Sequence, residues 1–178
     1  MTYIMLYFNE LGLGELELGK SLEQINSIIK FGPKDRETLI PSPNADSWYK
    51  YTGEITGLSD GKGLSFPAEA VYLAVNQENK VNRIWIYPKM ETIGISIENL
   101  LSNIYGEPGM SVGGVGELGG IKRHTGYFYA SKDKVSQVIY MKVFDTEFAG
   151  PEFISFRFIN DDNALKYHLS YRTWKKYM

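Results

Sequence analysis

The amino-acid sequence predicts an α+β fold, a single unit over residues 1–178 built from two tandem repeats. Each repeat is expected to be a short helix packed on an antiparallel sheet of about four strands. Three observations support this: two similar segments 75 residues apart, helix-type apolar spacing in both, and strand-type alternation after each. The first repeat is expected to span residues 12–88 and the second residues 89–178.

The similar segments are residues 19–33 and 94–108, and six of their 15 aligned positions are identical. The identical pairs are Gly19 and Gly94, Ser21 and Ser96, Glu23 and Glu98, Ser27 and Ser102, Ile29 and Ile104, and Pro33 and Pro108. The first paired serines can accept hydrogen bonds at a helix N-terminus, where the paired glutamates complement the helix dipole. Glycine and proline at the end of each segment are typical of a helix C-terminus. We therefore predict helices over residues 21–31 and 96–105.

Both predicted helices carry one apolar stripe and are about three turns long. The stripes consist of Leu22, Ile25, Ile28 and Ile29 in the first segment and Ile97, Leu100, Leu101 and Ile104 in the second. Helices of this length are marginal in isolation, so each must pack on a sheet.

The segments after each helix alternate between apolar and polar residues, which predicts strands. These are residues 48–56, 64–75 and 81–87 in the first repeat and residues 123–130, 135–143, 153–159 and 164–172 in the second. Residues 81–87 are apolar on both faces towards their end, which is typical of a central strand or of the place where the two repeats meet. Residues 1–10 read as an edge or extra strand.

Composition is typical of a globular protein, with 43% hydrophobic and 22% charged residues. The formal net charge of −2 gives no general attraction to nucleic acid or to anionic membranes. The chain has no cysteine, which suits a reducing compartment. No segment has the length of a membrane span, and residues 1–10 lack the features of a secretory signal. We therefore expect a cytoplasmic protein.

The repeat carries a resemblance to a known family. The elements are a glycine, a serine cap, a short helix ending near a proline, and a later hairpin with an Asn-rich turn, in residues 19–33 with 76–86 and residues 94–108 with 160–169. They resemble the module of SmpA/OmlA-type lipoproteins, and their tandem arrangement is similar to the β-lactamase inhibitory proteins. The resemblance implies a non-enzymatic protein that binds another protein through the sheet face left free by its helices.

The sequence lacks the export signal and the paired cysteines of the secreted inhibitors. A cytoplasmic inhibitor, such as an immunity protein that neutralises a toxin, fits the resemblance better, with a toxin or an enzyme as the partner. Aromatic, arginine and apolar side chains on the strands and near the C-terminus are the predicted partner-binding residues. They are Tyr72, Ile84, Ile86, Arg157, His168, Arg172 and Trp174.

No catalytic, cofactor-binding or metal-binding residue is predicted. Residues 114–119 match the G-x-G-x-x-G spelling of a dinucleotide site but lack the strand before and the helix after it, so a flexible loop over residues 109–120 is expected. His124 and His168 have no acid or second histidine at ligand spacing. The clustered carboxylates in Asp161-Asp162-Asn163 are interpreted as part of a turn.

Two alternatives to protein binding stay open. Residues 171–177 interleave basic and aromatic side chains, a pattern that suits single-stranded nucleic acid, although the acidic chain makes this unlike most nucleic-acid-binding modules. An enzyme whose site assembles from scattered Asp, Glu, Tyr and His residues is the other alternative.

Overall fold

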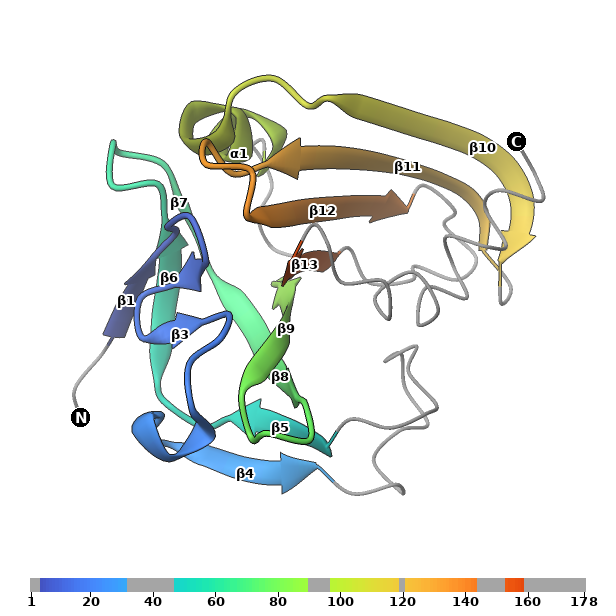
Figure 1. Ribbon diagram of the computed structural model, residues 1–178. Helices are drawn as coiled ribbons and strands as arrows, with labels where there is room; N and C mark the ends of the chain where they lie inside the picture. Colours follow the sequence, from blue (N-terminus) through green and yellow to red (C-terminus); the bar gives the residue numbers. More distant parts are fainter. Residues whose placement is uncertain (1–3, 32–46, 90–96, 119–120, 144–152, 159–178) are drawn as a thin grey trace.

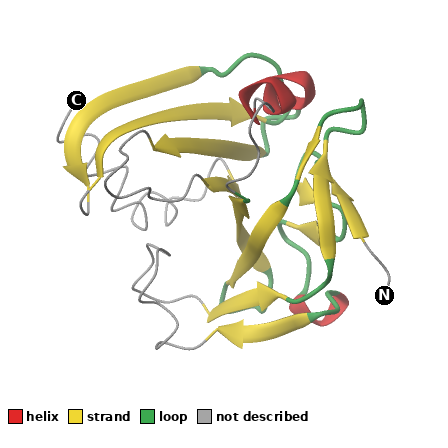
Figure 2. Cartoon of the chain, turned by 180° about the vertical axis from the view of Figure 1, so that it is seen from behind, coloured by secondary structure: helices red, strands yellow, loops and turns green. Residues whose placement is uncertain are grey.

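The computed structural model of the chain describes residues 4–31, 47–89, 97–118, 121–143 and 153–158, most of which lie in β-strands (Figure 1). The strands are β1 (Ile4–Tyr7), β2 (Gly12–Leu13), β3 (Leu16–Glu17), β4 (Ile28–Phe31), β5 (Ser47–Tyr51), β6 (Ile55–Ser59), β7 (Ser65–Phe66), β8 (Ala68–Val75), β9 (Val81–Pro88), β10 (Met110–Leu118), β11 (Ile121–Ala130), β12 (Ser136–Val143) and β13 (Phe153–Phe158). The helical elements of the described residues are a 3₁₀ turn, η1 (Leu22–Gln24), and α1 (Ile97–Tyr105). Figure 2 shows these two elements at opposite ends of the molecule.

Eight of the described strands form one antiparallel sheet in the order β10-β11-β12-β13-β9-β8-β5-β4, which bends strongly in Figure 1. Of these strands, four adjacent ones come from the described part of the first half of the chain and four from that of the second half. Within the described residues, however, the α-helix occurs in the second half alone. The prediction of an α+β fold with two tandem repeats, each carrying its own helix, is therefore wrong, because the protein is mostly β.

Strand β9 lies in the middle of this sheet, between β8 and β13. Ile86 lies opposite Ile154 and Ile84 opposite Phe156 of β13, and all four side chains are fully buried. Trp85, which points to the other face, is fully buried as well. The prediction of a central strand is confirmed, and its reason is that a strand apolar on both faces needs cover on both.

The main core lies on the face of the sheet that carries Ile84 and Ile86. A smaller sheet with the order β1-β6-β7 and the hairpin of β2 and β3 pack against this face. Phe8, just after β1, stacks on Phe156 of the large sheet with ring centroids 5.9 Å apart. β1 pairs with β6 at one edge of the smaller sheet, which confirms the predicted edge or extra strand in residues 1–10.

The opposite face of the large sheet holds a second, smaller apolar cluster. Trp85, Tyr87 and Ala74 are buried there, with Tyr72 and Phe153 packed against them. The rings of Trp85 and Phe153 have their centroids 4.5 Å apart. Both faces of the sheet therefore contribute buried side chains.

The helix predicted over residues 21–31 is wrong. η1 ends after one turn, Ser27 then adopts a left-handed φ of 58°, and β4 forms an edge strand paired with β5. Ile29, expected on the apolar stripe of a helix, is 55% exposed on β4. A residue with positive φ interrupts a right-handed helix, so the local pattern does not continue past the first turn.

Long-range backbone pairing explains this difference. The Gly19 N–H donates to the Val81 carbonyl (2.7 Å), and the Leu22 N–H donates to the Asn79 carbonyl (2.9 Å). These bonds hold the start of the segment beside the turn between β8 and β9. A helix cap contributes about 1 kcal/mol, which is too little to outweigh strand pairing together with the burial of Ile25 in the main core.

The flexible loop predicted over residues 109–120 is also wrong over the residues that the structure describes. Residues 110–118 form β10, which pairs with β11 from Met110 opposite Phe128 to Gly114 opposite His124. A strand ladder uses backbone N–H and C=O groups alone. A glycine-rich segment can therefore enter a sheet although its sequence shows no apolar alternation.

Helix α1 confirms the prediction for residues 96–105 to within one residue at its start. Ile97, Leu100 and Leu101 of the predicted stripe are buried in the main core, together with Tyr105. Gly106 follows with a φ of 82°, and its N–H donates to the Ser102 carbonyl (2.9 Å). This is the glycine-terminated helix end that the sequence predicts.

The turn between β6 and β7 contacts α1 through Asp60. One carboxylate oxygen of Asp60 accepts from the Lys62 N–H (2.8 Å) and the Leu64 N–H (3.0 Å), and the other accepts from the Asn103 side-chain amide (3.3 Å). Burial acts to raise the pKa of Asp60, but these hydrogen bonds and the Lys62 charge outweigh it and hold the pKa below 3.8. The ionised carboxylate therefore ties the smaller sheet to the helix.

In the part of the chain that the structure describes, neither helical element is long and apolar enough to cross a bilayer.

Replacing Ile84 by alanine is expected to lower the free energy of unfolding by about 2–5 kcal/mol, because it leaves a cavity at the centre of the sheet. The matched control is Ile29→Ala on the edge strand, where a loss below about 1 kcal/mol is expected. Urea denaturation measures both. Equal losses for the two variants would contradict the assignment of β9 to the centre.

Stability is expected to fall as the pH drops below 3.8 and through the lowered pKa of Asp60, because protonation removes an acceptor that the folded state uses. The Asp60→Asn variant should be less stable at neutral pH and should lose less stability in acid. Glu54→Gln is the control, since the exposed Glu54 carboxylate has no hydrogen bond among the described residues. Urea denaturation at pH 7 and pH 3 tests this, and parallel pH profiles for Asp60→Asn and wild type would refute it.

Candidate partner-binding hollow

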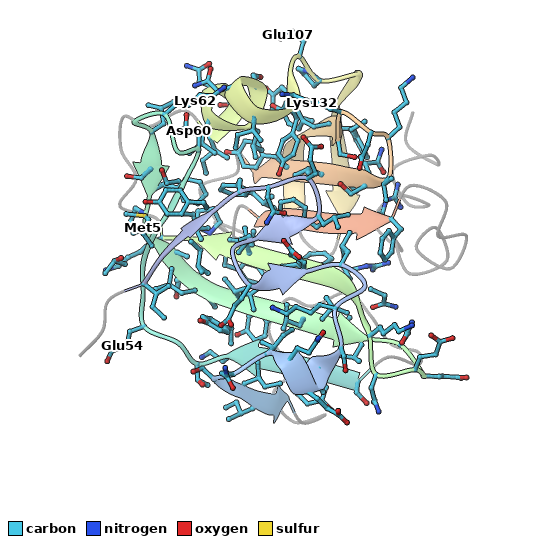
Figure 3. The ribbon with its side chains drawn as sticks, turned by 60° about the vertical axis from the view of Figure 1, so that its left-hand side comes forward. Met5, Glu54, Asp60, Lys62, Glu107 and Lys132 are labelled. Carbon is cyan, nitrogen blue, oxygen red and sulfur yellow. The ribbon has the colours of Figure 1, made fainter. Side chains whose placement is uncertain are left out.

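A hollow of about 390 Å³ lies where the connection from α1 to β10 passes the end of β11. Its walls come from α1, from that connection, and from the hairpin of β11 and β12. The lining residues are Tyr105, Glu107, Gly109, Phe128, Tyr129, Ala130, Ser131, Lys132, Lys134 and Gln137. We call this feature the hollow; Figure 3 shows Glu107 and Lys132 at the end of the molecule where α1 lies.

The end of α1 forms one wall of the hollow. The Tyr105 hydroxyl donates to the Asn9 carbonyl (2.7 Å), which fixes its ring against the turn after β1. The Gly109 N–H donates to the Phe128 carbonyl (2.9 Å), which holds the connection beside β11. Both contacts join residues that are distant in sequence, so the hollow depends on the fold and not on one local motif.

The opposite wall is the turn between β11 and β12, whose polar groups bond to one another. The Ser131 hydroxyl accepts from the Val135 N–H (3.1 Å) and the Ser136 N–H (3.0 Å) and donates to an Asp133 carboxylate oxygen (2.5 Å). The hydrogen bonds from Ser131 and Val135 hold the pKa of Asp133 below its usual value. The turn is therefore internally satisfied and keeps a negative charge at its centre.

Glu10, in the turn after β1, fastens this hairpin to the rest of the protein. Its carboxylate accepts from the Lys132 N–H (2.8 Å), and its carbonyl accepts from the Ser136 hydroxyl. A backbone donor and a side-chain donor of the hairpin thus meet one residue. Two hydrogen bonds to Glu10 therefore hold the hairpin wall in place. Neither bond uses the side chain of Lys132 or Lys134.

The rim of the hollow carries two positive charges and one negative charge. Lys132, Lys134 and Glu107 are all exposed. Within the described residues, the lysine ammonium groups and the Glu107 carboxylate make no ion pair or hydrogen bond. The rim charges are therefore available to a partner.

The inner surface of the hollow is aromatic. Tyr105, Phe128 and Tyr129 are buried, and the rings of Tyr105 and Tyr129 lie with centroids 6.5 Å apart. Burial raises the pKa of both tyrosines. They stay protonated at neutral pH and act as apolar rings with a hydroxyl donor.

The Tyr129 hydroxyl has no hydrogen-bond partner among the described residues, although it is buried. The Ser102 side chain lies close enough to act to lower its pKa, against the larger effect of burial. An unsatisfied buried hydroxyl costs about 1–3 kcal/mol.

The structure separates the residues predicted to bind a partner. Ile84 and Ile86 are fully buried in the main core, and Tyr72 is half-buried in the cluster on the opposite face. Arg157 is buried, and its guanidinium donates through Nε to the Gln137 side-chain oxygen (2.7 Å). Because Gln137 lines the hollow, Arg157 is the predicted partner-binding residue that contacts a residue of the hollow. His168, Arg172 and Trp174 lie outside the described residues.

The sequence analysis did not predict Lys132, Lys134, Glu107 or Tyr129 as residues of a candidate site. The predicted strands 123–130 and 135–143 leave a short charged turn between them, which was the available signal for Lys132 and Lys134. Nothing in the local sequence brings α1 to this turn.

The described residues contain no group of three or more His, Cys, Asp or Glu side chains placed to hold a metal ion. Exposed charged side chains around a hollow whose floor is made of buried aromatic residues are suited to recognition, because they offer charge around an apolar floor.

Replacing Tyr105 by phenylalanine is expected to lower the free energy of unfolding by about 1 kcal/mol, because it removes the hydrogen bond to Asn9. Tyr7→Phe is the matched control, since Tyr7 is 54% exposed, and a change within about 0.5 kcal/mol is expected there. Chemical denaturation followed by fluorescence measures both. A Tyr105→Phe variant as stable as wild type would show that this bond does not hold the wall.

Comparisons with protein-family models, with curated proteins and with solved structures find no match to this chain. The resemblance to the inhibitor module therefore stays a prediction.

Proposed function

We propose that this chain is a non-enzymatic protein-binding module that neutralises a partner, as an inhibitor or immunity protein does, and that the hollow is its contact. One observation carries the proposal. An aromatic hollow bears two exposed lysines that have no ion-pair partner in the described part of the chain. The partner is a protein, either a toxin or an enzyme.

The inner surface of the hollow suits an anchor side chain. Aromatic residues near the centre of a contact contribute most of the energy of protein association when they hold one partner group in a dry pocket. The volume of about 390 Å³ lies at the small end of the range for binding pockets. It suits one large side chain with its neighbouring backbone.

The rim supplies the polar part of such a contact. Charged groups around an interface mainly increase the rate of association and the specificity. The two lysines lie beside the carboxylates of Glu107, Asp133 and Glu10, so charges of both signs surround the hollow and favour one docking position.

The hollow is also held in place before a partner arrives. The bonds from Tyr105 to Asn9 and from the hairpin to Glu10 fix both walls. A preformed contact loses less conformational entropy on binding, which favours tight association. The absence of cysteine from the sequence supports a cytoplasmic place of action.

A photo-crosslinking amino acid at position 134 tests the proposal in cells that make the protein. Gln77, exposed in the turn between β8 and β9, is the control position, and Figure 1 shows that turn at the end of the molecule away from α1. We expect one adduct of defined mass at position 134 and none at position 77. Mass spectrometry identifies the bound protein, and adding this chain to that protein once purified is expected to abolish its activity.

Adducts at both positions in equal yield, or none at position 134, would contradict a contact at the hollow. A specific adduct whose partner keeps full activity would leave binding in place and remove the neutralising role.

A further inference from the structure

We infer that β1 is a docking edge for a second copy of this chain. Two β1 strands pair antiparallel about Met5 and so join two copies of the smaller β1-β6-β7 sheet. This inference goes beyond the proposed function, because β1 takes no part in lining the hollow. It is carried by the open backbone groups of β1, by its exposed apolar side chains and by the absence of charge on the strand.

The outward edge of β1 offers a hydrogen-bond donor and an acceptor on one residue. The Ile4 N–H donates to the Glu54 carbonyl (2.9 Å), on the side of β6. Backbone groups alternate in direction along a strand, so those of Met5 and Tyr7 face away from β6. The Tyr7 carbonyl accepts from the Gly14 N–H (2.8 Å). Among the described residues, the Met5 N–H and carbonyl have no hydrogen-bond partner.

The side chains of this edge are exposed and apolar. Met5 is 38% and Tyr7 54% exposed, and they are two of the four exposed large hydrophobic side chains in the described part of the chain. The strand reads Ile-Met-Leu-Tyr and contains neither a charged residue nor a proline. Proteins commonly use such residues to prevent an exposed edge from pairing with another chain. β1 is therefore an edge that is open to pairing.

A second copy satisfies this edge symmetrically. With Met5 opposite the partner's Met5, the two residues exchange both hydrogen bonds, as in a hydrogen-bonded antiparallel pair. The same register brings the half-buried Ile4 opposite the partner's Leu6 and Leu6 opposite the partner's Ile4. Such reciprocal contacts are what a two-fold dimer requires. Each β1 edge is used once, so association at this edge stops at the dimer.

The expected dimer is weak and leaves the hollow open. Stable specific interfaces bury about 1,200–2,000 Å², and two four-residue strands bury less. Dimerisation is therefore expected to depend on concentration in the micromolar range. Figure 3 shows Met5 apart from Glu107 and Lys132, so a partner at the hollow and a second copy at β1 do not compete.

Single cysteines test the register in the full chain, which has no cysteine of its own. In Met5→Cys the paired residues have Cα atoms about 5.5 Å apart, which suits a disulfide. In Tyr7→Cys they are about 14 Å apart along the strand. Val135→Cys is the control, because Val135 is similarly exposed (43%) but lies in a turn.

With oxidised glutathione as the oxidant, we expect Met5→Cys to form a covalent dimer about tenfold faster than either other variant, because the disulfide requires close Cα atoms. Intact-mass spectrometry over time measures the rates. Equal rates for Met5→Cys and Val135→Cys, or the fastest reaction for Tyr7→Cys, would overturn the inference.

Sedimentation equilibrium of the unmodified chain tests the dimer without a crosslink. Met5→Lys places two like charges opposite each other, so its dissociation constant is expected to be about tenfold higher than that of wild type. Val135→Lys makes the same change of charge and should have no effect. A wild-type chain that stays monomeric up to about 1 mM, or an equal effect of both variants, would overturn the inference. If Met5→Lys does not fold, the cysteine variants decide.

Discussion

The pairing of β9 with β13 is the constraint on which the rest of the structure depends. Among the described strands of the sheet, β9 is the last one from the first half of the chain and β13 is the last one from the second half. Four residues of each strand lie in register, from Ile86 opposite Ile154 to Arg83 opposite Arg157. Ile84, Ile86, Ile154 and Phe156 close one face of this joint. The two halves of the chain form one continuous sheet because β9 and β13 pair.

The position of the hollow follows from this joint. The smaller sheet packs on the core face of the large sheet, where Phe8 stacks on Phe156. The next residues, Asn9 and Glu10, then meet α1 and the hairpin of β11 and β12. A segment near the start of the chain thus places both walls of a site formed by the second half, which no local sequence pattern contains.

Much of the strand pattern could be predicted from the sequence, since the residue pattern along a strand is a local property: β8, β12 and β13 alternate between apolar and polar residues, and β9 is apolar on both faces towards its end. The helix ending at Gly106 was predictable for the same reason. The helix prediction for the segment after Ser21 failed because the helix cap that suggests it is present for one turn only. The hydrogen bonds to Asn79 and Val81 that hold this segment beside the sheet are non-local. With β4 in place of a helix, the duplication inferred from matching residues does not describe the fold. The hollow could not be predicted because two segments distant in sequence form it, and a third segment, around Asn9 and Glu10, holds them in place.

Amide hydrogen exchange of the intact chain tests most directly whether the two halves form one sheet. If β9 and β13 are joined, their amides are expected to exchange with the free energy of global unfolding, while the edge strand β4 exchanges faster. Exchange of β9 and β13 with two different free energies, each matching its own half of the chain, would show that the halves open separately and would contradict the account.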